Sequence, residues 1–209
     1  MKTAYRLAST VVDVETDEPG SGAWLSEFLH PWAEVVPHGS GGTVVRMVTS
    51  PASVDAIERR RVGTCARQVP CFALDSRVVV LPAWDDRGGM VIADAELACH
   101  YRLEPGAVEV VARPESRRAR IGLMRVVREM LAAPVVGAGA IAEVHAAAFC
   151  VGERAVLLAG AKGTGKTTML IHALMSRSAS FVANDRVFIG GSSGPAFVGG
   201  VPTVVSIRP

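Results

Sequence analysis

The chain has 209 residues, of which 49% are hydrophobic and 20% charged, a composition typical of a folded globular protein rather than a disordered one. This length allows one substantial domain or two small ones. The 22 basic and 20 acidic residues leave a net charge of only +2, which excludes a strong overall field for a polyanion such as nucleic acid. Any anion site must therefore be local.

The sequence shows no CxxC pair and no zinc-finger spacing among its four cysteines, Cys65, Cys71, Cys99 and Cys150. We therefore expect reduced thiols rather than disulfides or a structural metal. Residues 1–13 lack the apolar segment of a signal peptide, which favours a cytoplasmic location. Residues 132–152 are nearly uncharged over the length of a membrane span, but Pro134, Glu143 and His145 favour a buried strand or helix. We expect no membrane partner.

Strand patterns dominate the first part of the chain. Residues 3–14 and 43–48 are predicted as strands, with a short helix at residues 23–33 between them. Four further short runs, joined by Arg-Gly-Gly, Leu-Ala and Glu-Pro-Gly connections, predict a meander of antiparallel strands at residues 77–84, 90–96, 98–104 and 107–113. We therefore expect a β-rich N-terminal domain over residues 1–115.

The hydrophobic period changes after Pro114 to that of an amphipathic helix. Its apolar face contains Ile121, Met124, Val127 and Leu131, and we expect the helix to end at Pro134. The helix also carries several arginines, and residues 59–61 are an arginine triplet. Both groups suit a solvated surface better than a nucleic-acid site, because the triplet has no aromatic residues interleaved with it.

The remaining residues, 116–209, follow the order of a P-loop unit. Strands are predicted at 144–151 and 155–159, followed by a glycine-rich loop, a helix at 165–175 and a strand at 180–189. Residues 197–208 are predicted as further strand. A nucleotide-binding sheet usually needs more chain than this, so we expect the core to be incomplete at its C-terminus.

The loop at residues 160–167, GAKGTGKT, matches the phosphate-binding pattern G-x-x-x-x-G-K-[ST] between an apolar strand and a helix. Glycines let backbone N–H groups turn toward phosphate oxygens at the positive end of the helix. We expect Lys166 to reach the β- and γ-phosphates and the Thr167 hydroxyl to bind Mg²⁺, so the expected cofactors are ATP and Mg²⁺. The motif predicts these nucleotide-binding residues: Gly160, Lys162, Gly163, Thr164, Gly165, Lys166, Thr167 and Thr168. Lys162 suits an ordinary solvent-exposed lysine equally well.

A phosphoryl-transfer site also needs a carboxylate that holds the metal or accepts a proton. Asp185 interrupts an apolar strand eighteen residues after Thr167. Because burying an unpaired acid is costly, we expect Asp185 to be both a metal ligand and a catalytic residue. Period-two alternation places Asn184 on the opposite face, and we expect the charged residue to address the phosphates. Arg186 would either neutralise charge in the transition state or pair with Asp185.

Three segments together resemble the bacterial HPr kinase/phosphorylase family: VHAA at 144–147, AVLLAGAKGTGKTT at 155–168 and FVANDRVFI at 181–189. More narrowly, they resemble the HPr-kinase-like proteins found beside peptide and natural-product biosynthesis genes. The resemblance covers about residues 140–209 and implies a P-loop core similar to that of ATP-dependent phosphoenolpyruvate carboxykinase. It also implies that His145 lies near the phosphates as a catalytic residue, with a core histidine as the alternative.

The same resemblance places the family's acidic pair on Asn184 and Asp185, so this chain keeps only the second acid. The family's later glutamate-containing signature has no match in residues 190–209, and the phosphorylase activity is not implied.

We therefore expect an α/β protein, with a β-rich N-terminal domain (1–115) followed by a PEP-carboxykinase-like P-loop core (116–209). The expected function is an ATP-dependent kinase that phosphorylates a hydroxyl of a peptide, a protein or a small compound. Its catalytic residues would be Asp185, Lys166 and His145, and its metal ligands Thr167 and Asp185. The alternative is a nucleotide-dependent binding or regulatory module; a transport- or motor-type NTPase is a third possibility. A homo-oligomer is left open, and nucleic acid is not an expected partner.

Overall fold

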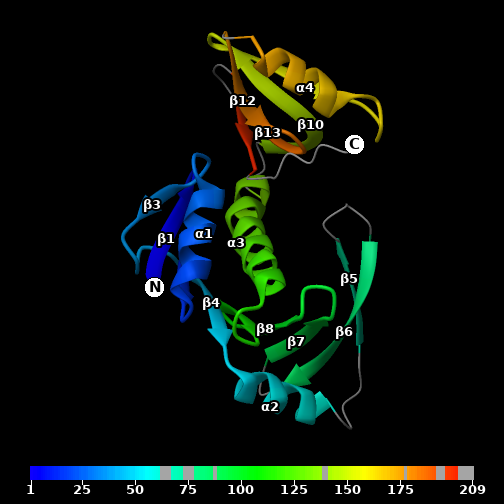
Figure 1. Ribbon diagram of the computed structural model, residues 1–209. Coiled ribbons are helices and arrows are strands. Elements are labelled where there is room, and N and C mark those ends of the chain that lie inside the picture. Colours follow the sequence, from blue (N-terminus) through cyan, green and yellow to red (C-terminus); the bar gives the residue numbers. More distant parts are fainter. Residues whose placement is uncertain are drawn as a thin grey trace. The chain divides into compact units, whose positions relative to one another are not determined.

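The computed structural model (Figure 1) describes residues 1–61, 67–72, 78–86, 89–137, 141–176, 178–191 and 196–201. These residues form a strand-rich α/β chain with four helices, divided into two compact units. Unit 1 comprises Met1–Arg6, Thr10–Phe28 and Glu34–Leu131. Unit 2 comprises Leu7–Ser9, Leu29–Ala33 and Ala132–Pro209.

Unit 1 is built on one sheet, in which the described strands follow the order β3-β1-β2-β4-β9-β8-β7-β6-β5. Their bounds are β1 (Lys2–Leu7), β2 (Thr10–Thr16), β3 (Glu34–Val36), β4 (Thr43–Thr49), β5 (Arg67–Phe72), β6 (Val78–Asp86), β7 (Gly89–Asp94), β8 (Cys99–Glu104) and β9 (Ala107–Ala112). The antiparallel meander predicted from the sequence is confirmed for β6 to β9. β4 lies between β2 and β9 and is parallel to both.

The prediction of a single strand at residues 3–14 is wrong. β1 and β2 are separate strands joined by a turn at Ala8 and Ser9, and Ala8 adopts a positive φ of 53°. The turn contains neither glycine nor proline, the strongest sequence markers of a reversal, so the sequence gives little sign of it.

Three helices begin in unit 1: α1 (Pro19–Leu29), α2 (Pro51–Arg61) and α3 (Arg117–Gly137). The helix predicted at residues 23–33 therefore starts and ends four residues earlier than expected. α3 continues three residues beyond Pro134, where we expected it to end. A proline removes one backbone donor, and so close to the end of a helix that loss affects only the last turn.

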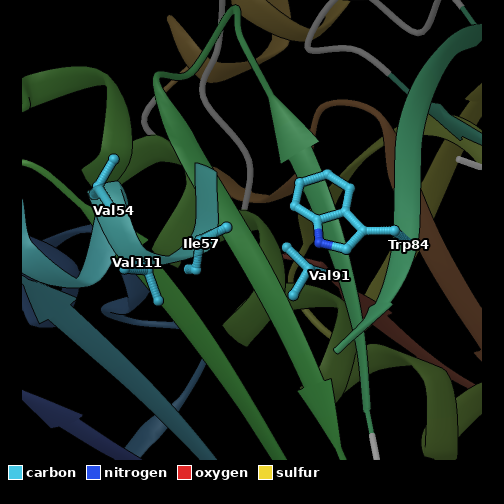
Figure 2. Packing of buried hydrophobic residues seen from close by; sticks show 5 residues of the cluster. All are labelled: Val54, Ile57, Trp84, Val91 and Val111. Atoms are coloured by element: carbon cyan, nitrogen blue, oxygen red, sulfur yellow. The ribbon is translucent and has the colours of Figure 1, made fainter. Parts of the chain in front are cut away.

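α2 was not predicted, and it covers part of the sheet through a small apolar cluster. Val54 and Ile57 of α2 pack with Trp84, Val91 and Val111 of the strands, and all five side chains are buried. Figure 2 shows this cluster, with the indole ring of Trp84 beside Val91.

The arginine triplet lies at the end of α2, and two of its members make contacts inside unit 1. Arg60 donates to both carboxylate oxygens of Asp86, at 3.1 and 2.9 Å. The Arg61 guanidinium lies 5.7 Å from the centre of the Trp84 ring. These two side chains therefore join α2 to the sheet rather than forming a purely solvated face.

The first part of α3 belongs to unit 1 because its apolar face is buried there. A Cβ atom at Gly122 would lie 3.0 Å from Cys99 Sγ, so the helix approaches β8 closely. Arg125, which we expected on a solvated face, lies 3.7 Å from the buried carboxylate of Asp94. Burial also raises the pKa of the Cys99 thiol to about 12. The units divide at Leu131, later than the boundary expected near residue 115.

Unit 2 contains the strands β10 (Ile141–Val151), β11 (Arg154–Ala159), β12 (Ala179–Ala183), β13 (Arg186–Gly190) and β14 (Phe197–Gly200), with the helix α4 (Lys166–Leu174). β10 is antiparallel to β11 along one edge and to β12 and β13 along the other. β14 continues the sheet beside β13. The strand predicted at 197–208 is thus described only up to residue 200, and residues 202–209 lie outside the described part.

The strand predicted at residues 180–189 is also wrong as a single element. It is divided into β12 and β13 by a bend at Asn184 and Asp185. Apolar residues flank the polar residues Asn184, Asp185 and Arg186, and the bend falls at this polar interruption. The bend is central to the candidate site.

Cys71, Cys99 and Cys150 are free thiols, and Cys65 lies outside the described residues. Among the helices that are described, none combines the length and the apolar character needed to cross a membrane.

Candidate functional site

The glycine-rich loop leaves the end of β11 at Ala159 and enters α4 at Lys166. Gly163 and Gly165 adopt φ angles of 88° and 85°, which a residue with a Cβ atom rarely adopts. Gly165 is the N-cap of α4 and makes no side-chain cap hydrogen bond. The sequence-based prediction of strand, loop and helix is confirmed for this segment.

Lys166 extends back over the loop. Its Nζ donates hydrogen bonds to the carbonyl oxygens of Gly160 and Ala161, at 2.8 and 3.1 Å. The Thr164 hydroxyl also donates to the Ala161 carbonyl, at 2.9 Å. The start of the loop is therefore held by two side chains from its end, and the ammonium group lies over the loop itself.

Asn184, the first residue of the bend, meets the start of α4. The Thr167 hydroxyl donates to Asn184 Oδ1 at 3.1 Å. We expected only one of the two residues, Asp185, to address the phosphates, because strand alternation would place the two side chains on opposite faces. That argument does not apply, because neither residue lies in a strand.

Asp185, the second residue of the bend, meets β10 instead. Its Oδ1 lies 2.9 Å from Nδ1 of His145, and its backbone carbonyl accepts a hydrogen bond of 3.1 Å from the amide of Ala146. The His145 side chain is 56% exposed, so it is not a core histidine. Ala146 pairs with Ala159, the last residue before the loop. The backbone of His145, one residue earlier in β10, therefore lies opposite the start of the loop.

Arg186 follows the bend and forms a bidentate ion pair with Glu143. Arg186 Nε and Nη2 donate to the two Glu143 carboxylate oxygens at 2.6 and 2.9 Å. Arg186 is also the cross-strand partner of His145, so the ion pair is next to the histidine. Of the two roles expected for Arg186, pairing with a carboxylate is seen, but the partner is Glu143.

The side chains at the bend and at the start of α4 present oxygen and nitrogen atoms at a polar surface. Thr167 and Asn184 offer neutral oxygen atoms, and Asp185 offers a carboxylate one residue further along. Mg²⁺ is usually held by one or two protein oxygens together with water and phosphate oxygens, rather than by a complete protein cage. The donor set fits such an ion, and in the described part of the chain no group of three or more His, Cys, Asp or Glu side chains is arranged to hold a metal by itself.

Six of the predicted site residues fall into two groups. Lys166, Thr167, His145 and Asp185 each make contacts around the loop and the bend, as described above. Lys162 and Thr168 are exposed residues of the same segment. Sequence reasoning missed Asn184 as the partner of Thr167, and it missed Glu143. The nearest signal for Glu143 is its place two residues before His145, which puts both on one face of a strand.

Comparison of the chain with protein-family models, with curated proteins and with solved structures gave no match.

Proposed function

We propose that unit 2 binds the phosphates of a nucleoside triphosphate with Mg²⁺ and transfers the γ-phosphoryl group to a hydroxyl. The observation that carries this proposal is the bend at residues 184–185. Its two consecutive residues contact two different elements, Thr167 at the start of α4 and His145 on β10. A helix N-terminus after a glycine loop attracts phosphate, and the bend adds oxygen donors and a titratable pair beside it.

In this proposal each group has a separate task. Lys166 and the loop amides stabilise negative charge on the phosphates. Thr167, Asn184 and the Asp185 carboxylate would supply oxygen ligands to the metal. Bound ATP with Mg²⁺ would supply the phosphoryl group. The acceptor's hydroxyl proton would pass to the Asp185–His145 pair as its oxygen bonds to the γ-phosphorus, while the bond from that phosphorus to the bridging β-phosphate oxygen breaks and ADP leaves.

The acceptor class comes from the family resemblance in residues 140–209. It favours a serine-like side chain of a peptide or protein, or a small hydroxyl compound. This part of the proposal has its own test, because a kinase transfers labelled γ-phosphate to an acceptor other than water.

The alternative is a nucleotide-dependent regulatory module without transfer. One observation favours it: the residue next to Thr167 is the neutral Asn184, so less negative charge is available to hold Mg²⁺ than with two acids. The two functions separate in one assay. A regulator binds Mg·ATP and leaves the γ-phosphate in place, whereas a kinase releases ADP and labels an acceptor.

Lys166→Ala tests the phosphate site. We expect this variant to remain folded, because the side chain lies over the loop rather than in the core, and to lose Mg·ATP binding or turnover. A donor to transition-state charge is worth about 10²- to 10³-fold in rate. Titration calorimetry with Mg·ATP measures the binding, and Arg154→Ala, which removes an exposed basic residue at the start of β11, is the matched control. If Lys166→Ala binds and turns over Mg·ATP as the parent does, the phosphate site lies elsewhere.

A further inference from the structure

Trp32 is far from the candidate site in the sequence, yet it contacts the strand that leads into the site. Residues Leu29–Ala33 belong to unit 2, although the chain before and after them belongs to unit 1. The Trp32 indole Nε1–H donates to the backbone carbonyl of Val182 at 2.9 Å. Its ring meets the Phe181 ring edge-on, with the centres 5.7 Å apart and the planes at 81°. Both contacts are on β12, two and three residues before Asn184.

The hydrogen bond from Trp32 falls where the regular pairing of β12 is interrupted. Phe181 of β12 pairs with Phe149 of β10, and Ala183 pairs with Ala148. The register shifts between these two pairs, so Val182 has no partner residue in β10. Irregular pairing of this kind bends a strand and redirects the residues after it. An indole donor at this carbonyl therefore fixes the strand at the point where it turns toward the bend.

Gly200 of β14 lies against the same part of β12. A Cβ atom at position 200 would collide with the Val182 carbonyl oxygen, and it would lie 3.1 Å from Trp32 Nε1 and 3.0 Å from Ala183 Cβ. The indole, the carbonyl and the β14 backbone are thus in mutual contact. Closely packed groups transmit strain to their neighbours. A change at Trp32 should therefore alter the position of the end of β12.

We propose that Trp32 is a positioning residue for the candidate site. It holds the end of β12 so that Asn184 reaches Thr167 and Asp185 reaches His145, and the N-terminal part of the chain thereby contributes to phosphoryl transfer. The transfer role rests on the proposed function, whereas the positioning of the bend is a property of the protein without nucleotide.

Trp32→Phe is the deciding variant, because it keeps an aromatic ring at this position and removes the indole N–H together with part of the ring. Trp24→Phe is the matched control, since Trp24 stacks on Phe28 in α1, with ring centres 5.8 Å apart. The first readout is hydrogen exchange without nucleotide at the Ala146 amide, which bonds to the Asp185 carbonyl. We expect this amide to exchange roughly 3- to 10-fold faster in Trp32→Phe, the range that corresponds to one hydrogen bond.

Amides of the β10–β11 ladder at residues 155–157 serve as the internal reference. We expect them to be unchanged, which distinguishes a local effect at the bend from a general loss of stability. Phe181→Leu is a second variant that removes the other contact of Trp32, for the case in which Trp32→Phe does not fold. It should accelerate the same Ala146 exchange.

The second readout uses Mg·ATP. In Trp32→Phe we expect nucleotide affinity within about twofold of the parent, because the loop is intact, and transfer reduced by roughly 3- to 10-fold. If the Ala146 amide is as protected in both variants as in Trp24→Phe, Trp32 does not position the bend and the inference is overturned. If that amide is exposed but the parent does not bind Mg·ATP, the positioning stands and the proposed function fails.

Discussion

Two neighbouring residues, Asn184 and Asp185, illustrate how strongly a local conformation decides chemistry. In a strand, they would face opposite sides of the sheet and only one would address the loop. In the bend, Asn184 contacts Thr167 while Asp185 contacts His145. The amide and the acid therefore have separate partners, and substitutions at the two positions should have different effects.

At the residue scale, Asp185→Asn should abolish most phosphoryl transfer while leaving much of the Mg·ATP affinity. The reason is that the amide cannot receive the hydroxyl proton, whereas the loop proposed to bind the phosphates is unchanged. Losing a positioned acid or base typically costs about 10²- to 10⁴-fold in rate. Transfer of labelled phosphate and calorimetric binding, measured on the same preparation, separate the two effects.

Asn184→Asp is the companion to that variant. It adds a carboxylate next to Thr167 and should raise transfer if the metal lacks negative charge there. An Asp185→Asn variant that transfers phosphate at the parental rate would contradict the role of Asp185, and the regulatory module would then be the better description.

At the element scale, α2 and its contacts show how a helix without a strong apolar stripe is nevertheless fixed in place. Only Val54 and Ile57 of this helix are buried. Their partners, Trp84, Val91 and Val111, come from three different strands. The arginines at its C-terminal end, which also lie favourably with respect to the helix dipole, join the helix to Asp86 and Trp84.

Ile57→Ala should therefore lower the free energy of unfolding of unit 1 substantially. The side chain is fully buried, and truncation of such a residue costs about 2 to 5 kcal/mol through lost transfer energy and the cavity left behind. Urea unfolding measures the change, with the exposed Arg59→Ala in the same helix as the control, expected within about 0.5 kcal/mol of the parent. A loss no larger than that of Arg59→Ala would mean that α2 does not pack on this cluster.

At the scale of the whole molecule, unit 2 is assembled from three separate parts of the chain. The main part begins at Ala132, and the others are Leu7–Ser9 and Leu29–Ala33. Leu7 packs against the buried cluster of Ala132, Phe188 and Val201, and Trp32 packs on β12. The glycine loop and the bend therefore lie in a unit that residues 132–209 do not complete.

A fragment of residues 132–209 should accordingly be less stable than the same residues within the full chain. Without Leu7 and Trp32, the apolar side chains of Phe188 and Phe181 lose buried contacts, which are worth about 25 cal/mol for each Å² of apolar surface. Thermal unfolding and hydrogen exchange of β10 in the fragment and in the full chain provide the comparison. A fragment that melts cooperatively at the full-chain temperature would show that the two N-terminal segments are dispensable.

Several parts of this molecule follow from the sequence alone. The meander of β6 to β9 is predictable because its strands are short apolar runs with close connections, two of which contain glycine. The loop from Gly160 to Thr167 is predictable because its glycines and its Lys-Thr pair have fixed spacing between an apolar strand and a helix. Both depend on interactions between residues close together in the chain, and local patterns record such interactions directly.

Other parts were decided only by the tertiary structure. The polar residues 184–186 mark an interruption within residues 180–189, but how β12 and β13 each pair with β10 depends on the tertiary structure. The contacts of Asn184 with Thr167 and of Trp32 with Val182 join residues 17 and 150 positions apart. Such pairs depend on the path of the whole backbone, and a single sequence contains no local signal for them. The sequence by itself therefore determined the glycine-rich loop between a strand and a helix, whereas the tertiary structure decided which side chains surround it.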